Sequence, residues 1–241
     1  MRSLWGVADN APFSFQVLPS RLYLLSGVFF GHDFEAARSQ LEAFFMHKSS
    51  YEHMAACAGQ FLDGNKPLSI LDIGSYDVNG SYRPVFDRPG WQYRGVDLAA
   101  GPNVDLVLES PYRLPLASRS VDVVVSGQAF EHVPFFWLSW LEMVRVVKPG
   151  GHIFLIAPSR GPEHRYPEDC WRFYPDGFQA LAAWGRVHAL SIHTDWTPHH
   201  DADSALWGDT VGVFQVPEQS LWTRCRAGLI CRLAQRLVPG C

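Results

Sequence analysis

The pattern of hydrophobic and polar residues changes its period near residue 67. Upstream, from Asp33 to Asp63, apolar residues recur at helical spacing, which predicts two helices that meet near residues 48–50, with Asp33 as the N-cap. Downstream, short apolar runs bounded by proline and glycine are typical of buried strands. We expect strands over 68–73, 93–97, 104–108, 121–126, 152–157, 187–194 and 210–216.

Helices are predicted between several of these strands. An amphipathic stretch over 135–147 ends at a turn over 148–151, and another helix is expected over 175–184. Because strands alternate with helices, we expect parallel strands joined by right-handed crossovers. We interpret 1–241 as one domain, with an N-terminal arm and helices over 1–66, an α/β core over 67–216 and a basic amphipathic helix over 217–241.

Composition places the chain among large folded domains. Hydrophobic residues make up 47% of the 241 residues and charged residues 18%, which is enough apolar material for a large core. The formal net charge of −4 and the lack of a basic stripe argue against nucleic acid as a partner. Five scattered cysteines suit reduced thiols, and we see neither a signal peptide nor an apolar run that could span a membrane. We therefore expect a cytoplasmic protein without a membrane span.

The most informative local feature is a glycine-bearing turn after the first predicted strand. The sequence ILDIGSYDVNG over 70–80 leads from that strand into Gly74 and Gly80, whose missing side chains let a ligand approach the backbone. The spacing differs from a GxGxxG dinucleotide fingerprint, and no phosphate-binding GKS or GKT follows. Asp97 ends the next strand, 25 residues after Asp72, near the offset at which a carboxylate meets a ribose. Together these features predict a nucleoside site at the carboxyl ends of the strands.

Further blocks in the same order point to a family. LDIGSYDVNG over 71–80 is followed by LPLASRSVDVVVSGQAFEHV over 114–133 and by LEMVRVVKPGGHIFLIAPS over 141–159. The segment over 68–159 closely resembles the class I S-adenosylmethionine-dependent methyltransferases, nearest to the small-molecule branch with an LPF, FDVV, EHV and LKPGG series. The resemblance implies a Rossmann-like α/β fold with a seven-stranded, mostly parallel sheet flanked by helices. It also implies S-adenosylmethionine as the cofactor.

The resemblance assigns cofactor contacts to particular residues. This cofactor set is Asp72, Gly74, Ser75, Gly80, Asp97, Leu98, Ser110 and Gln128. Its first three members would surround the methionine end, while Asp97 would hold the ribose and Leu98 would flank the adenine. Ser110 stands where the family commonly has an acidic residue for the adenine amine, so Ser110 or a backbone group would replace that contact. Gln128 would border both the methionine and the acceptor.

A loop beyond the fifth predicted strand carries the candidate acceptor residues. The sequence over 161–178 resembles a segment, H-R-x-P-x-D-x-W-R-F-x-P-x-G-F, of methyltransferases associated with sugar and cell-surface polysaccharide pathways. Arg165 and Arg172 would clamp the acceptor, and Trp171 would stack on a sugar ring, with Tyr174 beside it. In the alternative interpretation, the aromatic residues of this loop only anchor it to the sheet.

Two histidines and one glutamate are candidates for the chemistry of methyl transfer to a hydroxyl. The acceptor must lose its proton to a base or to a metal that lowers its pKa. His132 adjoins the end of the fourth predicted strand and is the candidate base, unless it only caps the following helix; His164 is a second candidate. Glu131, His132 and His164 could also hold Mg²⁺ or another divalent cation, as in related O-methyltransferases that read ExxEH. Gln128 stands at the first glutamate position, which weakens such a site.

The sequence thus predicts an S-adenosylmethionine-dependent O-methyltransferase that acts on a sugar hydroxyl of a saccharide or glycoconjugate precursor. Its partner would be a small-molecule or oligosaccharide acceptor, and the C-terminal helix would suit a homodimer. A methyltransferase for a phenol, a polyketide or an amine is the alternative within the enzyme class. A cofactor-binding regulatory protein without turnover is the alternative outside it. The sequence HHDAD over 199–203 is read as a solvated loop, with a base or metal ligand as the other option.

Overall fold

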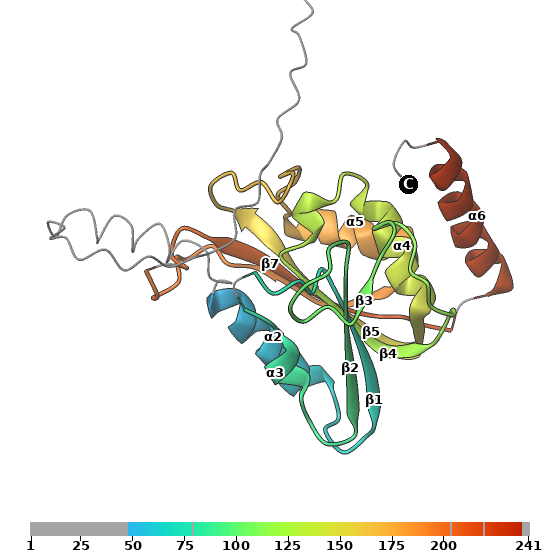
Figure 1. The fold of residues 1–241 in the computed structure, drawn as a ribbon, viewed down its shortest axis with the longest axis horizontal. Coiled ribbons are helices and arrows are strands. Elements are labelled where there is room, and N and C mark those ends of the chain that lie inside the picture. Colours follow the sequence, from blue (N-terminus) through green and yellow to red (C-terminus); the bar gives the residue numbers. More distant parts are fainter. Residues whose placement is uncertain (1–47, 79, 203, 219, 238–241) are drawn as a thin grey trace, which may run out of the picture. The chain divides into compact units, whose positions relative to one another are not determined.

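The computed structural model describes residues 48–78, 80–202, 204–218 and 220–237 (Figure 1). The chain divides into two units, Met1–Arg38 and Ser39–Cys241, and all described residues belong to the second. The predicted arm and the helix expected from Asp33 lie outside the described residues. The interpretation of 1–241 as one domain therefore stays a prediction.

Seven strands form one sheet in the order β3-β2-β1-β4-β5-β7-β6. The pairs β1–β2, β2–β3, β1–β4 and β4–β5 are parallel, and β7 is antiparallel to both β5 and β6. This confirms the seven-stranded, mostly parallel sheet. The strands are β1 (Leu68–Ile73), β2 (Trp91–Asp97), β3 (Leu106–Val107), β4 (Val121–Gly127), β5 (Val147–Arg160), β6 (His188–Thr194) and β7 (Gly208–Gln215).

Helices cover both faces of the sheet (Figure 1). They are α2 (Lys48–Phe61), α3 (Arg83–Phe86), the 3₁₀ turn η1 (Phe130–His132), α4 (Phe136–Val146), α5 (Pro175–Gly185) and α6 (Leu221–Leu237). Successive strand residues point to opposite faces, so Ile70 packs in the core with α2 and α3, whereas Leu71 packs in the core with α4 and α5. Trp140 of α4 is fully buried in the second core and donates its indole N–H to the backbone oxygen of Leu181 at 2.7 Å. No helix among the described residues is long and apolar enough to cross a membrane.

Two predicted elements differ from the structure. The turn expected over 148–151 is wrong, because β5 runs through it: Gly150 N–H donates to Val216 O at 2.7 Å, and Val216 N–H donates to Gly151 O at 3.0 Å. The strand expected over 104–108 shrinks to Leu106–Val107. Asn103 before it has a left-handed φ of 66°, and the Asp105 carboxylate accepts from the Gly95 N–H and from Arg83, so this stretch bends before it pairs.

Candidate functional site

The site lies where the strand order reverses. β1 is flanked by β2 on one side and by β4 on the other, so the connections that leave β1 and β4 run in opposite directions. Such a switch point opens a crevice at the carboxyl ends of the parallel strands. Because β7 is antiparallel, its first residues lie at the same edge: Asp209 of β7 pairs with Pro158 near the end of β5.

The turn after β1 brings backbone and glycine together at this crevice. Gly74 adopts φ of 79°, and the N–H groups of Gly74 and Ser75 both donate to Val96 O, at 3.0 and 3.2 Å. Ser75 is buried and donates its hydroxyl to Asn103 O at 3.3 Å. Gly80 has φ of 142° and donates its N–H to Asp77 Oδ1 at 2.6 Å. Three predicted cofactor residues therefore share one tightly bonded turn.

Replacing Gly74 with alanine tests how tightly this turn is packed. A Cβ there would lie 2.5 Å from the Cβ of Ala129, and the positive φ adds backbone strain. We expect Gly74→Ala to lower the free energy of unfolding by roughly 2–4 kcal/mol in urea denaturation, from overpacking and left-handed strain together. Gly150 is a matched control, because its φ is 81° but no atom of the described residues beyond its chain neighbours lies within 4 Å of its Cβ position. Equal losses in the two variants would contradict the packing account.

Asp97 ends β2 and organises the adjoining loops. Its Oδ2 accepts the Tyr76 N–H and its Oδ1 accepts the Ala99 N–H, both at 3.1 Å. Each carboxylate oxygen can accept a second hydrogen bond, so both keep capacity for a pair of hydroxyl groups. Leu98 follows with 51% of its surface exposed, as a residue that flanks a flat ring requires.

Asp72 is a buried carboxylate inside β1. It accepts a hydrogen bond from the Tyr93 hydroxyl through Oδ2, whereas its Oδ1 is buried with no hydrogen-bond partner in the part of the chain that the structure describes. Burial raises the pKa of Asp72 to about 7, despite the opposing effects of Tyr93 and Arg83. An unpartnered buried carboxylate oxygen is costly, and a ligand cation would satisfy it. Tyr93 was not predicted as a site residue, although it lies only two residues before the glycine that faces Asp72 across the sheet.

Ser110 and Gln128 use their side chains within the protein. The Ser110 hydroxyl accepts the Tyr112 N–H at 3.2 Å, so it stabilises its own turn. Gln128 has a left-handed φ of 54° and donates its Nε2 to Asp209 Oδ1 at 2.8 Å and to the Ser50 hydroxyl at 3.2 Å. Both predicted contacts to a ligand stay predictions.

Asp209 and Ser50, the hydrogen-bond partners of the Gln128 side chain, were not predicted as site residues from the sequence. Asp209 is fully buried, its Oδ2 has no hydrogen-bond partner among the described residues, and burial raises its pKa to about 6. Ser50 in turn shares a hydrogen bond of 2.7 Å with the buried Tyr82 hydroxyl. An acidic residue at the start of a strand and a serine at the start of a helix carry little signal by themselves.

Glu131, His132 and His164 come together as predicted. Glu131 is fully buried, and within the described ranges neither of its carboxylate oxygens has a hydrogen-bond partner. The Nε2 atoms of His132 and His164 each lie 3.6 Å from Glu131 Oε1, and the two rings meet edge to face at 4.9 Å. The ion pair with Glu131 raises the pKa of His164, against the opposing effect of burial. The three ligand atoms lie within 4.8 Å of one another, a spacing that a metal ion could bridge.

The loop between β5 and α5 supplies the predicted acceptor residues in different settings. Arg172 binds both carboxylate oxygens of Asp169, at 2.5 and 2.9 Å, and thereby braces the loop. Arg165 is exposed and pairs with Glu163 at 2.7 Å. Trp171 donates its indole N–H to two backbone oxygens, those of residues 133 and 134, and keeps 37% of its surface exposed.

Two aromatic residues from the loop between β6 and β7 contact residues of the 161–178 segment. Trp196 stacks on Tyr174 with 6.3 Å between ring centroids and 8° between planes, and both rings are largely exposed. Trp207 meets the His164 ring edge to face at 4.8 Å. In the same loop His199 lies 3.2 Å from Glu52, which places part of the predicted 199–203 loop against α2. Neither Trp196 nor Trp207 was predicted as a site residue.

Comparison with known proteins gives a consistent picture. A family model described as a methyltransferase domain matches residues 71–155. An uncharacterized methyltransferase of Mycobacterium sp. (strain KMS) is 38% identical over 185 residues, which cover 67% of this chain and 71% of the relative. Another from Mycobacterium leprae (strain Br4923) is 31% identical over 164 residues, covering 60% of this chain and 58% of that relative. The chain therefore spans only somewhat more than half the length of the latter.

Among solved structures, the Burkholderia thailandensis 1,6-didemethyltoxoflavin-N1-methyltransferase, with 1,6-didemethyltoxoflavin and S-adenosylhomocysteine bound, has a TM-score of 0.56. Its sequence identity is 12%, and the match covers 81% of this chain and 94% of that one. This likeness concerns the fold, and the identity to the mycobacterial relatives concerns the family. With the sheet order, the turn after β1 and these relatives taken together, the chain belongs to the class I S-adenosylmethionine-dependent methyltransferases.

Proposed function

We propose that this protein transfers the methyl group of S-adenosylmethionine to a hydroxyl group of a sugar, in a saccharide or glycoconjugate precursor. The observation that carries the cofactor half is the pair of carboxylates at neighbouring strand ends, Asp72 with an unpartnered buried oxygen and Asp97 with spare acceptor capacity. The structural neighbour with bound S-adenosylhomocysteine supports the same cofactor.

The residues present fit that cofactor. Asp97 would accept both ribose hydroxyls, and Leu98 offers an exposed apolar side chain beside the adenine. Asp72 Oδ1 would accept from the ammonium group of the methionine end, which removes the cost of its unpartnered burial. The positive φ of Gly74 lets the chain turn sharply after β1, beside Asp72. When bound, S-adenosylmethionine would supply an electrophilic methyl group on its sulfonium, with the thioether sulfur as the leaving group when an acceptor oxygen attacks in line.

Substitution of Asp72 by asparagine has effects of opposite sign on stability and on binding. Because burial raises the pKa of Asp72 to about 7, the folded chain keeps a proton that the unfolded chain releases near pH 4. The stability from this group is present below pH 4 and is lost as the pH rises through 7. The quantity to measure is the unfolding free energy of Asp72→Asn minus that of the native chain, from urea denaturation. We expect this difference to be roughly 2–4 kcal/mol more favourable to the variant at pH 8 than at pH 4.

The same variant should bind S-adenosylhomocysteine more weakly, because an amide lacks the charge that pairs with an ammonium group. Asp105→Asn is the matched control: although burial acts to raise the pKa of Asp105, the Gly95 N–H and Arg83 hold it below its usual value. That variant should lose stability at neutral pH instead. A stability difference for Asp72→Asn that does not change between pH 4 and pH 8 would contradict the account.

His132 is the residue we propose as the general base. Its Nδ1 contacts the backbone oxygen of Glu168, which requires a proton on Nδ1. In the neutral ring Nε2 then carries a lone pair, on the side that faces Glu131. Protonated His164 would balance the buried Glu131 charge, so His132 stays free to take the acceptor proton as the new C–O bond forms and the C–S electron pair leaves with sulfur.

A divalent cation held by Glu131, His132 and His164 is the second option for the same centre. One carboxylate oxygen lies 3.6 Å from each of two imidazole nitrogens, and no described residue donates a hydrogen bond to it. A bound Mg²⁺ or other cation would lower the pKa of a coordinated hydroxyl and replace the base. Activity that is lost in EDTA and restored by added metal would select this option over the base.

Exposed aromatic side chains support the proposal that the acceptor is a sugar, because a sugar ring has C–H faces. Trp171, Tyr174 and Trp196 present exposed aromatic faces near the loop that carries His164, and such faces stack on sugars. A labelled-methyl transfer screen over monosaccharides, oligosaccharides, phenols and amines tests this class directly. Transfer to phenols or amines alone would replace the sugar proposal by the metabolite alternative. Binding of S-adenosylhomocysteine without transfer to any acceptor would favour a regulatory, cofactor-binding role.

A further inference from the structure

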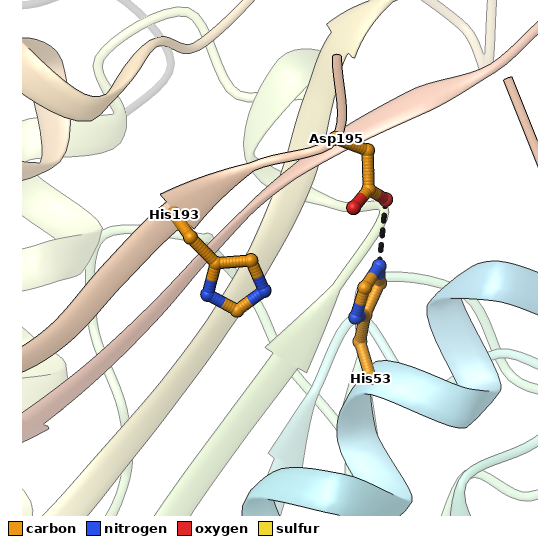
Figure 2. A group of neighbouring side chains, drawn as sticks. All are labelled: His53, His193 and Asp195. Atoms are coloured by element: carbon orange, nitrogen blue, oxygen red, sulfur yellow. Dashed lines mark hydrogen bonds and ion pairs between the residues drawn. The ribbon is translucent and has the colours of Figure 1, made fainter. Parts of the chain in front are cut away.

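Besides the Glu131 centre, formed by Glu131, His132 and His164, three other side chains converge where α2 meets the end of β6 (Figure 2). His53 comes from α2, His193 lies near the end of β6 and Asp195 follows that strand directly. His53 Nε2 lies 2.6 Å from Asp195 Oδ2, and the two imidazole rings meet edge to face with centroids 5.5 Å apart. One ligand atom from each residue lies within 4.8 Å of the other two.

Two imidazoles and one carboxylate form a donor set of particular chemistry. Imidazole nitrogen suits Zn²⁺ and related first-row ions far better than Mg²⁺ or Ca²⁺, which prefer oxygen ligands. Ligands roughly 2.1 Å from a tetrahedral Zn²⁺ are roughly 3.4 Å apart, so the observed spacing needs only small side-chain rotations to close around an ion. Three protein ligands also leave one position for water or another small ligand.

We propose that His53, His193 and Asp195 bind a divalent transition metal of the Zn²⁺ class, at a site whose ligands take no part in the proposed methyl transfer. The ion would join α2 to the end of β6. Its ligands His53 and His193 are 140 positions apart in the sequence. Solvent can reach the site: His193 is exposed, and the side chains of His53 and Asp195 keep 22% and 27% of their surface.

The surroundings hold the carboxylate ligand in place. The backbone N–H of Asp195 donates to Asp209 O at 2.9 Å, which fixes the residue after β6 against β7. On the α2 side, Glu52 precedes His53 and pairs with His199 at 3.2 Å, so an imidazole of the β6–β7 loop lies against the same helix. A ligand set fixed by its neighbours loses little freedom when an ion binds.

Calorimetry and spectroscopy with the full chain test this proposal. We expect Zn²⁺ to bind, and we expect Co²⁺ at the same site to give visible absorption of a tetrahedral ion with nitrogen and oxygen ligands. His193→Ala and Asp195→Asn should each weaken Zn²⁺ binding at this site at least tenfold and remove the Co²⁺ bands. Their affinity for S-adenosylhomocysteine should stay unchanged, which separates a failure here from a failure of the proposed function.

Two controls fix the location. His188 is exposed at the other end of the same strand, so His188→Ala should bind metal like the native chain. His164→Ala removes a ligand from the Glu131 centre and should leave the Co²⁺ bands intact. Absence of Zn²⁺ binding to the native chain would overturn the proposal, as would bands that survive His193→Ala and Asp195→Asn. Strong thiolate-to-cobalt absorption that persists in both variants would also overturn it, because exposed Cys170 or Cys225 would then be the ligand.

Discussion

Asp97→Ala is expected to weaken S-adenosylhomocysteine binding by at least 100-fold. Two ribose hydroxyls would each lose a hydrogen bond to a charged acceptor, and bonds of this kind contribute about 1.5–3 kcal/mol each. The substitution also removes the acceptor of the Tyr76 and Ala99 N–H groups, so the loops after β1 and β2 lose their shared anchor. Isothermal titration calorimetry with S-adenosylhomocysteine measures the change directly.

Asp87→Ala is the matched control for this loss. Asp87 is exposed at the C-cap of α3, in the segment before β2. Asp97 is the last residue of β2. We expect native affinity in that variant, and an intermediate affinity in Asp97→Asn, which keeps one acceptor oxygen. If Asp97→Ala binds as tightly as the native chain while it remains folded by circular dichroism, the cofactor assignment fails.

His132→Ala is expected to lower kcat by about 10²–10⁴-fold, the usual contribution of a positioned general base. The acceptor used would be one found in the labelled-methyl screen. Affinity for S-adenosylhomocysteine should change little, because the His132 ring faces Glu131 and the Glu168 backbone rather than the turn after β1. A loss confined to kcat distinguishes a base from a residue that shapes the cofactor site.

Further measurements separate the base from the cation. Added imidazole should partly restore His132→Ala, and EDTA should leave the native rate unchanged. A native rate that falls in EDTA and returns with Mg²⁺ would transfer the role to a metal held with Glu131 and His164. Full activity in His132→Ala would exclude both roles for this residue. His188→Ala serves as the histidine control, because His188 is exposed on β6.

The turn after β1 and the end of β2 could be predicted because their signals are local. A buried apolar run, a glycine in the turn and an aspartate at the next strand end are read from a few neighbouring residues, and the structure places Gly74 and Asp97 at adjoining strand ends. The Glu131 centre was reached through the family resemblance. Its geometry then depends on a loop that brings His164 back to η1.

The partners of these residues could not be predicted because they depend on register between distant segments. Tyr93 meets Asp72 only because β1 and β2 pair with Ile70 opposite Tyr93. Asp209 meets Gln128 only because β7 runs antiparallel, which places the start of that strand beside the ends of the others. His53 meets Asp195 through the packing of α2 beside the sheet.

The mistaken turn over 148–151 has a related cause. Proline and two glycines usually end regular structure, and the sequence alone offers no reason to expect otherwise. The backbone groups of Gly150 and Gly151 instead bond to Val216, a residue 66 positions after Gly150, so pairing with a distant segment outweighs local preference. The two-residue β3 shows the opposite case, because side-chain bonds of Asp105 compete with the backbone ladder.

The antiparallel β7 has a consequence for how this protein could change its acceptor. A hairpin loop is closed by the two strands it joins, so doubling its length costs only about 0.6 kcal/mol in chain entropy. The loop between β6 and β7 carries Trp196 and Trp207, whereas the residues that we propose to contact the ribose and the methionine, Asp97 and Asp72, lie on β2 and β1. Insertions in this loop would therefore alter the acceptor surface without shifting the strands that hold the cofactor. We expect sequence length to vary there more readily than anywhere in the turn over 72–80.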